Sequence, residues 1–205
     1  MEPKPLKFDK DSLKGISKET IETHHDKLYV GYVEKAEEVW SGLGKLRDKL
    51  ISGEAQGNQT YSELRALKQA ETFSVNGMYL HEWYFDVLGG DGDSNKAPEL
   101  SKAIEEKWGS VKDGIKYMTE CAMASRGWAV LAWDPRRGKI MQYNGDSHNQ
   151  GGVWGAIPVI VLDVYEHAYF MDFGADRKAY IEVFWNNFDW ERAEELYLKV
   201  REIKL

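Results

Sequence analysis

A buried apolar strand that ends in a carboxylate is the feature of this sequence that most constrains the fold. Residues 159–162 read Val-Ile-Val-Leu, and Asp163 follows them directly. A short continuous apolar run of this kind predicts a strand that is covered on both faces. A carboxylate at the end of such a strand is costly unless it is paired or binds a cation. The fold must therefore bring a partner to Asp163.

His167 is one candidate partner, because it lies four residues after Asp163. A carboxylate oxygen and an imidazole nitrogen at this spacing can converge on one ion, whether a turn or a helix follows the strand. The structural alternative is that Asp163 caps the following helix and His167 is a hydrogen-bonded core residue. One Asp and one His alone favour that alternative, so a metal site requires further ligands from elsewhere in the chain.

A first long helix is predicted to begin near Ser17, which is a good capping residue. The apolar residues that follow recur at helical spacing, and this spacing places His24 on the inner face. His25 points elsewhere, and we expect it to be exposed. The predicted inner face consists of Ile21, His24, Leu28, Gly31, Tyr32 and Val39.

A second long helix is predicted from about residue 61 to residue 88, after a polar break. Two long helices joined by a polar loop form an antiparallel hairpin, across which His24 and His81 can face each other. A glycine within a helix costs roughly 1 kcal/mol relative to alanine, so we expect another group to pack closely against Gly77. The predicted inner face consists of Leu64, Leu67, Ala70, Phe73, Gly77, Leu80 and His81.

A glycine- and aspartate-rich linker at residues 89–95 separates this helical half from a second, mixed half. The sequence of the second half predicts three strands. Two of them are joined at the turn Asp-Pro-Arg-Arg-Gly, and the third ends at Asp163. The predicted helices span residues 98–107, 110–123, 175–187 and 189–202, and the first two strands span 128–133 and 139–143.

Charge and cysteine content exclude several classes of protein. The net charge is −7 and no block is rich in Lys or Arg, which argues against a nucleic-acid binder. No apolar run approaches the ~20 residues of a membrane span, and the first residues lack the apolar core of a signal peptide. The single cysteine, Cys121, rules out an internal disulfide and favours a structural thiol in a reducing compartment. We therefore expect a cytoplasmic protein.

Four side chains form a candidate metal site when the two halves are combined. Three imidazoles and one carboxylate suit a first-row metal ion, and the absence of a thiolate favours iron or manganese over copper(I). Each histidine alone has a structural alternative as a packed or solvated residue, so the metal interpretation rests on their joint placement. The candidate ligands are His24, His81, Asp163 and His167.

The same residues lie in motifs that resemble those of the iron/manganese superoxide dismutase family. Residues 163–170, Asp-Val-Tyr-Glu-His-Ala-Tyr-Phe, are similar to the family signature Asp-x-Trp-Glu-His-Ala-[Tyr/Phe]-Tyr. Residues 21–24 with Tyr32 resemble the first helix of the family, and residues 81–85 resemble its second histidine motif. The resemblance covers nearly the whole chain, since it continues at residues 127–128, 156–158, 177–180 and 184–190.

The resemblance implies an α+β fold and a redox function. The implied fold is an N-terminal antiparallel helical hairpin, residues 1–89, and a C-terminal α/β domain, residues 96–205, with a three-stranded antiparallel sheet. The implied function is conversion of superoxide to oxygen and hydrogen peroxide by alternate oxidation and reduction of one iron or manganese ion per chain. The sequence leaves the choice between the two metals open. The implied metal ligands are His24, His81, Asp163 and His167.

The resemblance also implies roles for residues around the metal. Tyr32 matches the gateway tyrosine, and Trp128 matches a tryptophan that lines the site. His148 lies fifteen residues before Asp163, where archaeal and actinobacterial-type members place a histidine that hydrogen bonds to metal-bound solvent. Many iron enzymes instead supply a glutamine for this purpose from the position of Gly77.

Three charged residues complete the implied set. Glu166 resembles the residue that reaches a ligand histidine of the neighbouring subunit, which implies a homodimer or a homotetramer. Lys27 and Arg177 are candidates for steering the superoxide anion toward the site, which the negative net charge otherwise opposes. The alternative for both is an ordinary surface cation.

The sequence departs from the family pattern at three places. Leu28 replaces the second gateway histidine, Tyr165 replaces a tryptophan, and Phe85 stands where a site tryptophan is usual. Tyr29 is a candidate replacement for the lost imidazole beside Tyr32. These departures leave two rival functions open: a non-haem metal oxidoreductase that uses the same site, and a non-catalytic interaction subunit that keeps the fold.

Overall fold

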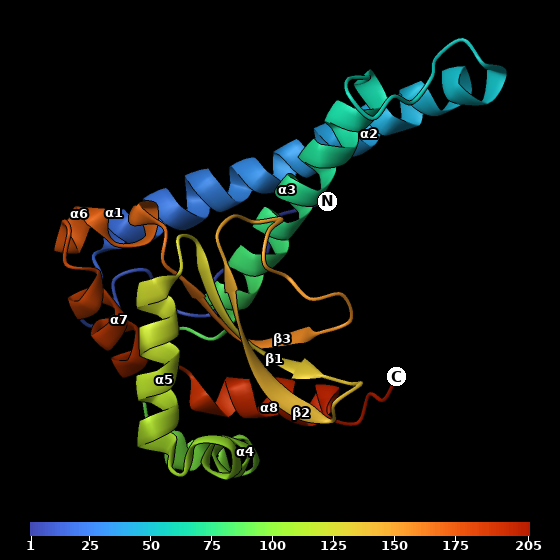
Figure 1. Ribbon diagram of the computed structural model, residues 1–205. Coiled ribbons are helices and arrows are strands. Elements are labelled where there is room, and N and C mark those ends of the chain that lie inside the picture. The colour runs from blue at the N-terminus through green and yellow to red at the C-terminus, as the bar shows by residue number, and fades with distance from the viewer.

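Two long antiparallel helical segments make up the first half of the protein (Figure 1). The computed structural model describes residues 1–205. A continuous helical rod consists of α1 (Lys18–Ile21), a π-helical segment (Glu22–Tyr29) and α2 (Val30–Ser52), and α3 (Glu63–Asp86) returns alongside it. Figure 1 shows that the far end of this hairpin projects well beyond the rest of the molecule.

Capping residues set the ends of the hairpin helices. The hydroxyl of Ser17 accepts a hydrogen bond from the backbone N–H of Thr20 at 3.1 Å, which confirms the predicted start of the first helix. Gly53, with a φ of +82°, ends α2 in the left-handed conformation that glycine adopts without strain. The hydroxyl of Ser62 caps α3 by accepting from the N–H of Arg65.

The π-helical segment changes which residues of the first helix face inward. Its hydrogen bonds span five residues instead of four, as in the bond from Val30 N–H to the carbonyl of His25. The prediction that His25 is exposed is therefore wrong, because only 8% of its surface is accessible. Gly31, predicted to face inward, is exposed, and Tyr29 is buried instead.

Helix α3 is packed closely against the first helix at Gly77. A β-carbon at this position would lie 2.7 Å from Cδ1 of Tyr32, so the expected close approach to the backbone is confirmed. Gly77 and His81 are buried as predicted. Phe73, which was also predicted to face inward, is 40% exposed, and the neighbouring Ser74 is buried in its place.

The second half is built on a three-stranded antiparallel sheet. Strand β1 (Trp128–Asp134) lies between β2 (Lys139–Gly145) and β3 (Ile157–Asp163). The register pairs Trp128 with Gly145 on one side and with Asp163 on the other. Residues 159–163 of β3 are all buried, as predicted for a strand that is covered on both faces.

Helices surround the sheet and join it to the hairpin. Helix α5 (Val111–Ala124) contacts β1 and β2, whereas α3 of the hairpin and α8 (Trp190–Val200) both contact β3. A single core of 34 buried residues draws on both halves, so the α+β architecture is confirmed and the end of β3 lies where the halves meet. None of the helices is both long enough and apolar enough to cross a membrane. The remaining elements are α4 (Pro98–Trp108), α6 (Phe170–Phe173), α7 (Arg177–Asn186) and two 3₁₀ turns, Ser94–Lys96 and Glu166–Ala168.

Candidate metal centre

Four side chains from four elements converge at the end of β3. His24 comes from the π-helical segment, His81 from α3, Asp163 from the last residue of β3 and His167 from the following 3₁₀ turn. Oδ2 of Asp163 lies 3.1 Å from Nε2 of His24, 3.1 Å from Nε2 of His167 and 3.5 Å from Nε2 of His81. One potential ligand atom from each residue lies within 4.8 Å of the others.

Burial and hydrogen bonding show that this cluster fits a metal ion. His24, His81 and Asp163 are fully buried. Nδ1 of His81 donates to the carbonyl of Gly77 at 2.6 Å, so the neutral ring directs the lone pair of Nε2 toward Asp163. That Nε2 atom is buried without a hydrogen-bond partner, which is rare in folded proteins. Three nitrogens and one carboxylate oxygen are a ligand set that iron and manganese accept.

The carboxylate of Asp163 is held in place through two further groups. Its Oδ1 atom accepts a hydrogen bond from the N–H of Tyr165 at 2.9 Å. Its main-chain carbonyl accepts from the hydroxyl of Tyr180 at 2.8 Å, and that hydroxyl is in turn 3.1 Å from the hydroxyl of Tyr84. The side chain caps a turn and not a helix. The alternative in which Asp163 serves only as a helix cap is therefore wrong.

The charge states at the cluster suit a cation. Burial alone would raise the pKa of Asp163, but the charges and hydrogen bonds of His167 and His24 outweigh it and hold that pKa well below its usual range. Burial lowers the pKa of His24 and lowers the pKa of His81 to about 3. Burial would lower the pKa of His167 too, but the charge of Asp163 and its hydrogen bond have the larger combined effect and raise that pKa. The protein thus presents an anionic oxygen and two neutral imidazoles, those of His24 and His81, whereas His167 must be deprotonated when a metal binds.

A hydrogen-bonded chain of three aromatic residues lies beside the ligands. The indole N–H of Trp128 donates to Nδ1 of His148 at 2.9 Å, and Nε2 of His148 lies 2.7 Å from the hydroxyl of Tyr32. Because an indole nitrogen can only donate, Nδ1 is the acceptor and Nε2 carries the proton that is donated to Tyr32. Burial lowers the pKa of His148 to about 4, so this imidazole is neutral near pH 7.

Tyr32 is therefore free to donate its own proton. Its hydroxyl accepts from His148 and has no other partner within the protein. The phenol ring stacks on that of His81, with centroids 5.2 Å apart, so Tyr32 packs directly against a proposed ligand. Burial raises the pKa of Tyr32 and keeps the phenol protonated. The space for this ring exists because residue 77 is glycine.

Two of the three departures from the family pattern lie against a ligand ring. The Tyr165 ring stacks on His167 with centroids 5.3 Å apart, and Phe85 lies 5.0 Å from the His24 ring. Leu28 is partly buried. Tyr29 does not take over from the missing imidazole, because its hydroxyl contacts Lys4 and Glu82 and not Tyr32.

The remaining candidate residues lie at the surface. Glu166 is exposed and lines a cavity of about 500 Å³ together with His167 and Arg177. The guanidinium of Arg177 donates to the carbonyl of Ser125 at 2.8 Å, so this residue is fixed next to the site. Lys27 is exposed and forms no ion pair. Cys121 is partly buried and burial raises the pKa of its thiol, which fits a structural role.

Sequence reasoning missed the two tyrosines behind Asp163. Tyr180 and Tyr84 are fully buried, and the hydroxyl of each finds its partner in a distant part of the chain. Both tyrosines lie within stretches that resemble the family, residues 81–85 and 177–180, and a buried hydroxyl requires a partner. That signal does not identify the partner.

A single-ion site of three histidines and one aspartate, set between a helical hairpin and a sheet domain, defines a mononuclear metalloprotein. Residues 2–89 match the profile "Iron/manganese superoxide dismutases, alpha-hairpin domain", and residues 96–196 match "Iron/manganese superoxide dismutases, C-terminal domain". The chain belongs to the iron/manganese superoxide dismutase family.

Curated relatives cover almost the whole chain. Superoxide dismutase [Fe] of Aquifex pyrophilus is 41% identical over 190 residues, which are 92% of this chain and 87% of the relative. Superoxide dismutase [Fe] of Aquifex aeolicus is 39% identical over 92% of this chain and 87% of its own length. Superoxide dismutase [Mn] of Haloarcula marismortui is 34% identical over 95% of this chain and 92% of its own length. Both iron and manganese proteins are thus similar to this chain.

Proposed function

We propose that this protein is a superoxide dismutase with one iron or manganese ion per chain. The observation that carries the proposal is the convergence of four ligand atoms within 4.8 Å at the end of a buried strand. Membership of the family supports it. In the reaction, one superoxide is oxidised to oxygen, and a second superoxide takes up one electron and two protons to become hydrogen peroxide. The proposed ligands are His24, His81, Asp163 and His167.

The bound ion supplies reversible one-electron transfer, and the surrounding residues handle protons. Peroxide formation consumes protons, so a donor beside the ligands is required. Tyr32 fits this role because its hydroxyl proton is not used within the protein, and His148 holds the hydroxyl in place from the other side. Trp128 orients His148 by donating to its Nδ1 atom. Hydrogen bonds of this kind around a metal site tune both acidity and redox potential.

Arg177 and Lys27 are proposed to attract the superoxide anion. The net charge of −7 repels an anion over long range, so local positive charge near the entrance is required. Arg177 is the stronger candidate because it lines the same cavity as His167. Lys27 is exposed on the π-helical segment that carries His24, and nothing else in its surroundings singles it out.

We further propose that the protein is a homodimer or a homotetramer whose contact surface includes Glu166. His167 is the only ligand with an exposed side chain, at 25%, and its Nδ1 atom has no partner within the chain. The exposed carboxylate of Glu166 is one residue away and can accept from His167 of the partner subunit. Phe170 and Met171, each 57% exposed, provide apolar surface next to it.

The division of the chain into residues 1–89 and 96–205 and a cytoplasmic location are also part of the proposal. The single cysteine supports a reducing compartment. Neither rival function has a specific observation in its favour. A non-haem oxygenase usually keeps two histidines and one carboxylate, so the third histidine counts against it. The complete ligand set counts against a non-catalytic subunit.

Elemental analysis and a dismutase assay on the same preparation test the proposal. We expect about one iron or manganese ion per chain and superoxide-dependent turnover. His81→Ala should abolish both, because it removes a buried ligand. His148→Gln is the matched control: it also removes a buried imidazole, but one that is not a ligand, and it should retain the metal. Full metal content without dismutase activity in the unchanged protein would favour the rivals.

A further inference from the structure

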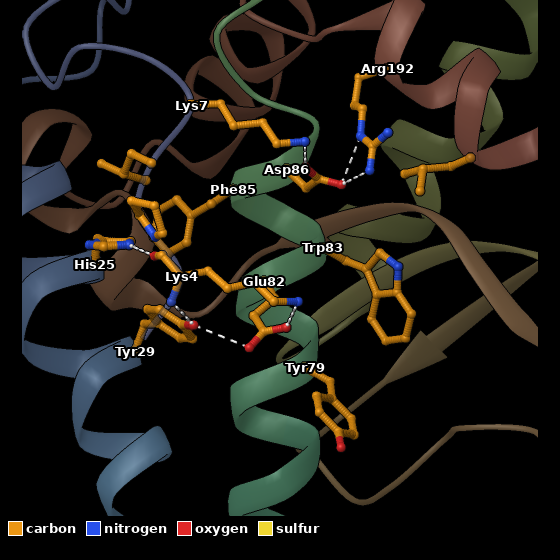
Figure 2. Close-up of a pocket in the computed structure, with 13 residues that line it drawn as sticks. Lys4, Lys7, His25, Tyr29, Tyr79, Glu82, Trp83, Phe85, Asp86 and Arg192 are labelled. Atoms are coloured by element: carbon orange, nitrogen blue, oxygen red, sulfur yellow. Dashed lines mark hydrogen bonds and ion pairs between the residues drawn. The ribbon is translucent and has the colours of Figure 1, made fainter. Parts of the chain in front are cut away.

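Residues 4–7 of the N-terminal arm, residues 1–15, line a crevice beside the two helices of the hairpin (Figure 2). A cavity of about 630 Å³ lies there between the arm, the π-helical segment, α3 and α8. Lys4 of the arm reaches toward the first helix, and Lys7 forms an ion pair with Asp86 of α3. The arm thus contacts both the segment that carries His24 and the helix that carries His81.

All three polar groups of Lys4 contact residues of the two hairpin helices. Its main-chain N–H donates to the hydroxyl of Tyr29 at 2.8 Å, and its carbonyl accepts from Nε2 of His25 at 2.9 Å. Its ammonium group pairs with the carboxylate of Glu82. The hydroxyl of Tyr29 also donates to Glu82 at 3.1 Å. Figure 2 shows this network closing across the gap between the two helices.

Each partner of Lys4 is adjacent to a proposed metal ligand. His25 follows His24 in the chain, and Glu82 follows His81. Tyr29 lies five residues after His24, which is one turn of a π-helix, and its ring stacks on that of His81 with centroids 6.4 Å apart.

Phe85 fills the space between the network and the metal centre. Its ring lies 5.1 Å from the His25 ring on one side and 5.0 Å from the His24 ring on the other. Phe85 therefore links the network to the metal centre, because its ring contacts those of both His25 and His24.

We propose that Lys4 is a positioning residue that ties the helices of His24 and His81 together and so controls how firmly the metal is retained. The inference rests on the proposed metal centre. Outer groups that orient metal ligands contribute about ten- to a hundred-fold to metal affinity or activity. Loss of the Lys4 network should therefore speed metal release by about ten-fold, at the lower end of that range.

The other end of the arm supplies a matched control. Asn187 holds Lys14 through the same two main-chain groups, since its Oδ1 accepts from the N–H and its Nδ2 donates to the carbonyl, both at 2.8 Å. None of its hydrogen-bond partners is adjacent to a metal ligand. Asn187→Ala therefore loosens the same arm without touching the network.

The test compares metal release with global stability in the metal-loaded protein. Tyr29→Phe removes only the hydroxyl that bridges the Lys4 N–H and Glu82, and deletion of residues 2–6 removes every contact of Lys4 while the Tyr29–Glu82 hydrogen bond within the hairpin remains. We would measure transfer of the metal to a colorimetric chelator, the unfolding midpoint in urea, and the electronic spectrum of the oxidised metal. Both variants should release metal about ten-fold faster and shift the spectrum, whereas Asn187→Ala should lower the urea midpoint with a nearly unchanged release rate.

Two results would overturn the inference. One is an unchanged release rate in both network variants. The other is the same relation between metal-release rate and urea midpoint in the network variants and in Asn187→Ala. The arm would then affect metal release only through the stability of the whole fold. If Tyr29→Phe does not fold, Lys4→Ala, an exposed change that removes the ammonium only, must still speed release by about two-fold or more. Failure of the proposed function is recognised separately, because the unchanged protein would then contain no metal to release.

Discussion

The hydrogen bond from Trp128 to His148 has a fixed direction, because the indole N–H can only donate. Nδ1 of the imidazole therefore accepts, and it lies 2.9 Å from the indole nitrogen. This bond determines which nitrogen of His148 carries the proton. It leaves Nε2–H pointing at Tyr32 and thereby leaves the Tyr32 proton available. Trp128, which is not a metal ligand, therefore sets the direction of both hydrogen bonds in the series Trp128–His148–Tyr32.

Trp128→Phe should therefore impair catalysis without removing the metal. Without the indole donor, His148 can exchange its two neutral forms and accept a proton from Tyr32 instead of donating one. We expect activity to fall by about ten-fold or more, with metal content per chain unchanged. Stopped-flow measurement of superoxide decay together with elemental analysis checks this. Activity equal to that of the unchanged protein would show that the direction of this bond is irrelevant.

The lowered pKa of His148 should make the protein less stable in mild acid. Its pKa is about 4 in the folded protein, against an ordinary value of 6.5. As the pH falls, His148 therefore takes up a proton in the unfolded chain before it does so in the folded protein. His148 has no effect on the free energy of unfolding well above pH 6.5, and it lowers that free energy increasingly as the pH falls to about 4.

His148→Gln removes this dependence. Between about pH 7 and about pH 5, the urea midpoint should fall less in His148→Gln than in the unchanged protein. Comparing the two proteins isolates His148, because the ligand histidines titrate in both. An identical loss of stability in the two proteins would contradict the lowered pKa.

Gly77→Ala should destabilise the protein, although alanine is normally the better helix former. The new β-carbon would lie 2.7 Å from the Tyr32 ring, which must move. Overpacking of this kind costs about 1–3 kcal/mol, and displacement of the ring should also lower activity. Gly31→Ala is the control, because no atom lies within 4 Å of a β-carbon there. It should stabilise the fold by up to about 1 kcal/mol in urea unfolding.

Tyr180→Phe should cost more stability than Tyr84→Phe. Loss of the Tyr180 hydroxyl leaves two buried groups without a partner, the Asp163 carbonyl and the Tyr84 hydroxyl. An unsatisfied buried group costs about 1–3 kcal/mol. Tyr84→Phe leaves the bond to Asp163 intact. Urea unfolding of both variants gives the order, and a larger loss in Tyr84→Phe would show that the bond to Asp163 contributes little.

Much of the fold was predictable because its signals are local. The apolar run before Asp163 identified a doubly covered strand, and Ser17 identified the start of the first helix. The α+β class was implied by the resemblance to a known family, and the order of the predicted helices and strands agreed with it. Residue type and spacing made His24, His81, Asp163 and His167 candidate ligands, and the resemblance of their motifs to a known family supported the metal site.

Other features were not predictable because they depend on a non-standard helical period or on distant contacts. An ordinary helix was assumed after Ser17, so the π-helical turn that buries His25 and Tyr29 was missed. A hydrophobic pattern carries no sign of such a turn. The contacts of Lys4 with that turn join residues 25 and 21 positions apart, and no local pattern encodes such pairs.

The ligands are also widely separated along the chain, with 139 positions between His24 and Asp163. During synthesis, the first histidine therefore leaves the ribosome long before the carboxylate that it must meet. A nascent chain that stops short of residue 167 has only part of the coordination sphere. The complete set of ligands is thus available only after residue 167 has been synthesised, and a fully coordinated ion shows that translation has passed this residue.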